Sequence, residues 1–138
     1  MTNWNERNRS VIEEFRANGG RAGTRPLLLL TTTGAKSGRP HTTPLIYLAD
    51  GNSMAVIASK GGDPSNPDWY RNLVANPTVR VEVKGESFET QARVAEPEER
   101  DRLFALQVEQ YPFFGQYQQK VKRRIPVVVL ERPSPGSS

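Results

Sequence analysis

The chain has 138 residues, of which 36% are hydrophobic and 25% are charged, a composition typical of one globular domain. Its net charge of +4 favours anionic ligands, but it is too small to predict nucleic-acid binding. With no cysteine and one histidine, the chain offers no disulfide and no thiol nucleophile, and no metal site is expected. Because no apolar run approaches the roughly 20 residues of a membrane span and the N-terminus lacks a signal-peptide pattern, a cytoplasmic protein is expected.

The first predicted element is a helix over residues 3–17, where apolar side chains recur on one face until Gly19 and Gly20 end the pattern. Two interpretations of this helix stay open. It can cap a barrel, or it can lie as a mobile amphipathic helix on a substrate entrance or a membrane surface. Because its polar face mixes acidic and basic residues, strong attraction to anionic lipid is not expected, although peripheral membrane contact stays open.

Short strands make up most of the remaining chain. They are predicted over residues 27–33, 40–49, 53–59, 78–84, 87–95 and 125–130, separated by turns rich in Gly, Pro, Asn and Asp. Two helices are predicted over 68–75 and 97–110, and a loop over 60–67. Six antiparallel strands with helices at the margins predict a mainly β barrel, as one domain over 1–132 with a disordered tail over 133–138.

The clearest functional signal lies in TTTGAKSGRPHTTPL, Thr31 to Leu45, which reads as strand, glycine turn and strand. No Asp or Glu occurs from Thr24 to Ala49, whereas Lys36, Arg39 and His41 all do. Glycines expose backbone N–H groups and a lysine adds a point charge, so the turn is a candidate anion site. It lacks the spacing of a P-loop, and a solvated basic hairpin tip would have the same sequence.

A second loop, ASKGG from Ala58 to Gly62, again combines a hydroxyl, a lysine and paired glycines. Two such loops on a small barrel favour a cofactor that carries phosphate or carboxylates. Trp69, in the segment NPDWYRNL, is expected to be a core residue, and it can at the same time form a wall for a flat cofactor ring.

The aromatic segment QYPFFGQYQQ, residues 110–119, has two interpretations. It is either a plug of the core or a lid over an apolar pocket, irregular because of Pro112 and Gly115. Hydrolysis by a catalytic triad is not supported, because His41 has no nearby acid and the chain has no G-x-S-x-G elbow. The site is therefore expected to hold a cofactor that carries the chemistry.

In chain order, TTTGAKSGRPHTTPL, ASKGG, NPDWYRNLVANP, YPFFGQY and IPVVVLE resemble the deazaflavin-dependent nitroreductase and quinone reductase family, over nearly all of Leu27 to Glu131. The resemblance implies a split β-barrel of the FMN-binding type. It also implies coenzyme F-420, an 8-hydroxy-5-deazaflavin with a phosphate and an oligoglutamate tail. The reduced cofactor would deliver a hydride from C5 to a quinone, an enone or a nitro compound.

Carried over residue by residue, the resemblance implies both cofactor-side and substrate-side residues. The cofactor-binding residues would be Lys36, Ser37, Gly38, His41, Thr43, Pro44, Ala58, Ser59, Lys60, Gly61, Gly62, Trp69 and Asn72. The catalytic residues would be Ser59, Tyr111 and Tyr117.

Three positions depart from the family pattern. His41 stands where the family often has arginine, and Thr43 stands where close relatives have asparagine. Phe114 replaces a tyrosine of the best-known members, so reduction of nitroimidazole prodrugs stays open. The proton donor to the product, whether Lys60, Ser59 or a tyrosine, also stays open.

Two other functions remain as alternatives. One is an FMN-dependent oxidoreductase on the same barrel, and the other is a non-catalytic carrier of the deazaflavin or of another amphipathic ligand. The expected partner is a small-molecule electron acceptor, and the protein is expected to be a monomer or a homodimer. Nucleic acid is not an expected partner, because the basic residues cluster at loops.

Overall fold

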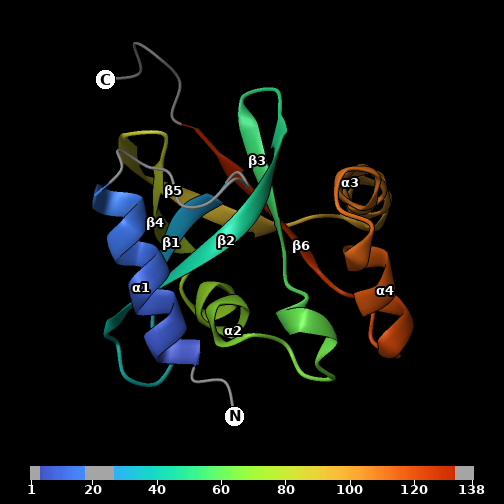
Figure 1. Cartoon of the computed structure of the whole chain (residues 1–138), viewed down its shortest axis with the longest axis horizontal. Helices are drawn as coiled ribbons and strands as arrows, with labels where there is room; N and C mark the ends of the chain where they lie inside the picture. The colour runs from blue at the N-terminus through green and yellow to red at the C-terminus, as the bar shows by residue number, and fades with distance from the viewer. Residues whose placement is uncertain (1–3, 18–26, 133–138) are drawn as a thin grey trace.

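Six antiparallel strands close into a barrel in the order β1-β2-β3-β6-β5-β4 (Figure 1). The structure, a computed structural model, describes residues 4–17 and 27–132. The strands are β1 (Leu27–Thr33), β2 (Pro40–Asp50), β3 (Ser53–Ile57), β4 (Thr78–Val83), β5 (Glu86–Val94) and β6 (Val127–Glu131). This architecture confirms the predicted split β-barrel with flanking helices, while the tail expected over 133–138 lies outside the described residues.

Each predicted strand is present, and the strand ends differ from prediction by at most two residues. The largest shifts are two residues: β3 ends at Ile57 and not at Ser59, and β6 begins at Val127 and not at Ile125. Pro126 has no N–H group for the ladder, and its carbonyl accepts a hydrogen bond of 2.9 Å from the N–H group of Ala58. The valines of β4 at 79, 81 and 83 are buried in the barrel interior, as their alternation predicts.

Apolar side chains form two main clusters, one inside the barrel and one between the barrel and its C-terminal helices. The inner cluster includes Leu28, Leu30 and Val56. In the outer cluster, α3 (Pro97–Gln110) and α4 (Phe113–Lys120) pack against outward-facing side chains of β2, β3 and β6 (Figure 1). α3 begins with Pro97 and has acidic residues in its first turn, both of which favour a helix N-terminus.

The prediction that residues 110–119 are irregular is wrong, because α4 occupies Phe113–Lys120. Pro112 stands immediately before the helix, where its missing N–H group costs no hydrogen bond. Gly115 lies within the helix at the contact with α3, where an added Cβ would be 3.5 Å from Cγ1 of Val108. Of the two interpretations, packing in the outer cluster is supported, since Phe114 is buried there.

The N-terminal helix α1 (Trp4–Ala17) lies across the outside of β1 and β2 (Figure 1). Its buried Phe15 packs against Leu29. Arg16 donates from Nη2 to Oε2 of Glu82 at 2.9 Å and from Nε to Oε1 at 3.3 Å, and this hydrogen bonding raises the pKa of Arg16. The apolar face therefore packs on the barrel, which gives no support to membrane contact through this helix. Within residues 4–17 and 27–132, no helix has the length and apolar character that a bilayer crossing requires.

Replacing Gln107 with methionine is expected to raise the free energy of unfolding by about 1–3 kcal/mol. Gln107 of α3 is 0% exposed, and neither its Oε1 nor its Nε2 has a hydrogen-bond partner among the described residues. Methionine keeps the volume and removes the buried polar atoms. Urea denaturation measures the change, with the exposed Gln110→Met as a control expected within about 0.5 kcal/mol of the unchanged protein. Destabilisation by Gln107→Met would contradict the expectation.

Candidate functional site

The turn between β1 and β2 presents Lys36, Ser37 and Gly38 at the exposed end of a tight hairpin. Gly38 has a φ of +69°, in the left-handed region that glycine adopts without strain. Its N–H group donates to the carbonyl of Gly34 at 3.0 Å, and the N–H group of Gly34 donates to the carbonyl of Arg39 at 2.8 Å. These bonds hold the turn closed and leave the side chain of Lys36 in solvent.

Asn72 ties this hairpin to the helix α2 (Asp68–Ala75), which crosses one end of the barrel. Its side chain is almost buried, with 8% exposed. Oδ1 accepts a hydrogen bond of 3.0 Å from the N–H group of Ala35, and Nδ2 donates to Oγ1 of Thr32 at 3.2 Å. Both ends of the amide are thus engaged within the protein, so Asn72 acts on the turn and is not presented as a free ligand group.

His41 and Thr43 lie on the same face of β2, the face of the barrel interior. Directly opposed residues of an antiparallel pair share a face, and Thr43 pairs with Leu30 while His41 pairs with Thr32. Both partners are buried on the inner side of β1. Nε2 of His41 is 3.4 Å from Oγ of Ser37, so His41 belongs to the same cluster as the turn.

Pro44 lies on the opposite face of β2. It pairs with Leu29, whose side chain packs against Phe15 of α1. Successive residues of a strand point to opposite sides, so Thr43 and Pro44 cannot both face the same ligand with their side chains. Among the residues expected to bind the cofactor, Pro44 is the one that the fold turns toward α1.

The second predicted loop leaves β3 and forms a short 3-10 turn, η1 (Lys60–Gly62). Ala58 and Ser59 are buried, whereas Lys60 is exposed. Lys60 and Gly62 have φ values of +48° and +86°, and the N–H group of Gly62 donates to the carbonyl of Ser59 at 3.0 Å. The loop is therefore a fixed turn whose shape depends on left-handed residues.

Beyond η1, the loop is closed by polar contacts of its own. Ser65 donates to Oδ1 of Asp63 from its N–H group at 2.9 Å and from Oγ at 2.7 Å, and these two hydrogen bonds lower the pKa of Asp63. Nζ of Lys60 donates to Oγ of Ser65 at 3.3 Å. The carboxylate of Asp63 is thus occupied by Ser65.

Arg123, which carries no distinctive signal in the sequence, is hydrogen-bonded to the backbone of this loop. Its guanidinium donates to the carbonyls of Ala58, Ser59 and Asp63 at 3.0–3.3 Å and to Oδ1 of Asn66 at 2.7 Å. Burial lowers the pKa of Arg123, and Asp63 partly offsets this effect. In the sequence Arg123 stands in a run of three cations, and no local signal distinguishes it from Lys122 or Arg124.

Of the two predicted substrate-side tyrosines, Tyr117 lies against the second loop. A Cβ at Gly62 would be 3.4 Å from Cα of Tyr117, so the loop and α4 are in close contact there. Tyr111 lies in the outer aromatic cluster, with its ring centroid 6.0 Å from that of Phe113 and 6.4 Å from that of Phe114. The structure therefore brings Tyr117 to the loop, and no described contact does so for Tyr111.

Trp69 of α2 is a core residue, with 6% of its surface exposed, and it packs in the inner cluster with Leu28 and Leu73. Its ring contacts Tyr70 edge to face, with centroids 6.5 Å apart. Core packing of Trp69 is therefore supported, and its role beside a cofactor ring stays a prediction.

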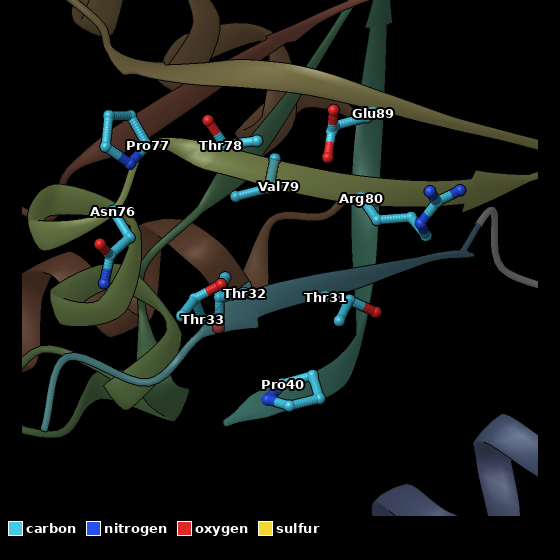
Figure 2. Close-up of a pocket in the computed structure, with 10 residues that line it drawn as sticks. All are labelled: Thr31, Thr32, Thr33, Pro40, Asn76, Pro77, Thr78, Val79, Arg80 and Glu89. Carbon is cyan, nitrogen blue, oxygen red and sulfur yellow. The ribbon is translucent and has the colours of Figure 1, made fainter. Parts of the chain in front are cut away.

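A pocket of about 320 Å³ lies beside the base of the hairpin (Figure 2). The β1–β4 ladder ends at the pair Thr31 and Arg80, and the strands separate beyond it. The pocket is lined by Thr31, Thr32, Thr33, Pro40, Asn76, Pro77, Thr78, Val79, Arg80 and Glu89. None of the residues expected to bind the cofactor lines this pocket.

The two predicted loops lie at the same end of the barrel, on either side of α2 (Figure 1). Each carries an exposed lysine, Lys36 or Lys60, and no salt bridge among the described residues neutralises either one. These two positive charges favour an anionic ligand that contacts both loops. This arrangement fits a cofactor with a ring system and a long acidic tail.

The sequence profile of the family described as F420H(2)-dependent quinone reductase matches residues 6–132. The chain belongs to this family. An F420H(2)-dependent quinone reductase of Mycobacterium tuberculosis is 44% identical to it over 126 residues, which are 86% of this chain and 85% of that relative. The predicted family is therefore confirmed, and the family is defined by the deazaflavin and not by FMN.

Solved structures agree with this assignment. One, described as an F420-H2 dependent reductase, is 45% identical with a TM-score of 0.72 and covers 80% of this chain and 98% of its own. Another, described as a domain-swapped dimer, is 41% identical with a TM-score of 0.74 and covers 92% and 96% of the two chains. As a member of the family, the protein is an oxidoreductase that uses reduced coenzyme F-420 and a small-molecule acceptor.

Proposed function

We propose that the protein reduces a quinone, with the hairpin turn and the ASKGG loop holding the cofactor from two sides of α2. The observation that carries this proposal is the pair of hydrogen-bonded, lysine-bearing turns at one end of the barrel. The choice of a quinone is supported by the 44% identical relative, which is described as a quinone reductase. When bound, coenzyme F-420 supplies the hydride, and the protein supplies binding and orientation.

On the cofactor side, Lys36 would contribute a charge to the phosphate and tail, and the backbone of Ser37 and Gly38 would contribute N–H donors. His41 would extend this basic cluster from β2. Ser59, Lys60 and the two glycines that follow would line the ring and its side chain. Asn72 would support this site by holding the turn in place.

On the acceptor side, Tyr117 would border the quinone because it adjoins Gly62. Its hydroxyl group can donate to a carbonyl oxygen that gains negative charge as the hydride arrives. Lys60 and Ser59, which precede Gly62 in the ASKGG loop, can also donate a proton to this oxygen. Tyr111 would shape the apolar side of the acceptor site through its contacts with Phe113 and Phe114.

The direct test is a fluorescence titration of the purified protein with reduced and oxidised coenzyme F-420 and, in parallel, with FMN. We expect saturable binding of the deazaflavin and turnover with menadione as the acceptor. Tight FMN binding without deazaflavin binding would overturn the proposal. Deazaflavin binding with no turnover of a panel of quinones, enones and nitroaromatics would favour a carrier.

Replacing Lys36 with alanine is expected to weaken deazaflavin binding by about 1–3 kcal/mol, because a charge-assisted contact to phosphate is lost. The dissociation constant is measured by the same titration. Lys84→Ala, at an exposed position of the β4–β5 turn, is the matched control and should leave the affinity unchanged. Equal affinity of the Lys36→Ala variant and the unchanged protein would remove Lys36 from the site.

We also infer that the protein forms a homodimer in the cytoplasm. The support for the dimer is the 41% identical neighbour described as a domain-swapped dimer. Light scattering coupled to size exclusion at several protein concentrations tests it, and a single monomer mass at all of them would overturn it. The cytoplasmic location stays a prediction from the sequence.

A further inference from the structure

We infer that Arg123 is a positioning residue, which fixes the ASKGG loop and α4 in one geometry for the cofactor and the acceptor. The inference rests on the proposed function, in which this loop lines the cofactor ring and Tyr117 borders the quinone. It adds a residue that lies outside both the hairpin and the loop.

The guanidinium of Arg123 acts on the shape of the loop through its backbone. Nη2 donates to the carbonyl of Ser59 at 3.1 Å and to that of Asp63 at 3.0 Å, and Nη1 and Nη2 each reach the carbonyl of Ala58 at 3.3 Å. In a trans peptide the N–H group points away from the preceding carbonyl. Directing the carbonyls of Ala58 and Ser59 toward Arg123 therefore directs the next two N–H groups to the other side of the loop, where they can donate to an anionic ligand.

All the acceptors of Arg123 are neutral. They are three backbone carbonyls and the side-chain amide of Asn66, and Arg123 forms no salt bridge among the described residues. The carboxylate of Asp63 accepts hydrogen bonds from Ser65, keeps its negative charge and offsets part of the field of Arg123. The contribution of Arg123 to the site is therefore the position of the backbone that it holds.

Arg123 also connects the loop to α4. Its own carbonyl accepts a hydrogen bond of 2.8 Å from Nε2 of Gln118, and Oε1 of Gln118 accepts from Arg100 at 2.7 Å and from the N–H group of Ile125 at 2.9 Å. Gln118 follows Tyr117 in α4, and Gly62 packs against Tyr117. The same residue thus sets the position of the loop and of the helix that carries the tyrosine.

The test compares Arg123→Met with Arg124→Met. Arg124 is exposed and pairs with Asp101, so its variant removes an adjacent cation without touching the loop. For Arg123→Met we expect the dissociation constant of coenzyme F-420 to rise about tenfold or more, and the KM for menadione to rise at saturating cofactor with a smaller change in kcat. For Arg124→Met we expect neither change.

A second variant, Asn66→Ala, keeps the arginine and removes its shortest hydrogen bond. It should raise the dissociation constant of coenzyme F-420 about threefold. This variant tests the inference even if Arg123→Met does not fold. In the cofactor-free protein, amide hydrogen exchange at Gly62 and Asp63 should become faster in both variants, because their N–H groups are bonded within the loop.

The outcomes separate the inference from the proposed function. If the unchanged protein does not bind coenzyme F-420, the proposed function fails and the inference fails with it. If the unchanged protein binds and the Arg123→Met and Asn66→Ala variants bind equally well, the inference alone is overturned. A lower thermal midpoint with unchanged dissociation constant and KM also overturns it, because that is the result of a purely structural role.

Discussion

Replacing Gly62 with alanine is expected to lower the free energy of unfolding by roughly 1–3 kcal/mol and to weaken deazaflavin binding by about tenfold. The φ of Gly62 is +86°, where any residue with a Cβ is strained. The new Cβ would be 2.9 Å from Cδ of Lys120 and 3.4 Å from Cα of Tyr117. The lysine side chain can move aside, but strain in the backbone changes the turn on which the cofactor site depends.

Gly51→Ala is the matched control for this experiment. Gly51, in the β2–β3 turn, has a φ of +60°, and an added Cβ would meet no atom within 4 Å. It should therefore lose a similar amount of stability through the backbone while deazaflavin binding stays unchanged. Urea denaturation gives the first quantity and fluorescence titration the second. Equal effects of the two variants on binding would show that lost stability, and not the geometry of the loop, weakens the site.

The strands and their turns were predictable because the signals for them are local. Alternating valines in β4 indicate one buried face, and glycine turns separate β1 from β2 and β2 from β3. The α4 helix was missed for a related reason. Pro112 and Gly115 are helix breakers when only neighbours in sequence are considered, but here one precedes the helix and the other permits close packing on α3.

For the candidate site, too, only signals that are local in the sequence could be predicted. The two lysine-bearing turns were found because their residue types are distinctive in a short window. Arg123 was not found, since burial among backbone carbonyls depends on the packing of β6 and α4 against a loop about 60 positions earlier. Pro44 and Thr43 were assigned together, yet adjacent residues of a strand face opposite sides, and only the register of β1 and β2 decides which side is which.

Replacing Asn72 with leucine is expected to lower the free energy of unfolding by roughly 2–3 kcal/mol and to weaken deazaflavin binding by about tenfold. Leucine has a similar size but cannot accept from the N–H group of Ala35 or donate to Oγ1 of Thr32. The hydroxyl of Thr32 is buried and would lose this partner, which accounts for much of the loss in stability. The freed turn would then sample other conformations, and Lys36 would bind the phosphate less often in the right geometry.

Thr32→Val distinguishes the two effects of Asn72. Valine removes the hydrogen bond to Nδ2 but leaves Oδ1 bonded to the N–H group of Ala35 at 3.0 Å, so the turn stays attached to α2. Stability should therefore fall by about 1 kcal/mol while the dissociation constant of coenzyme F-420 remains unchanged. If Thr32→Val weakens binding as much as Asn72→Leu does, the barrel end as a whole controls affinity. If only Asn72→Leu does so, the single bond from α2 to the hairpin turn holds the anion-binding end of the cofactor site in place.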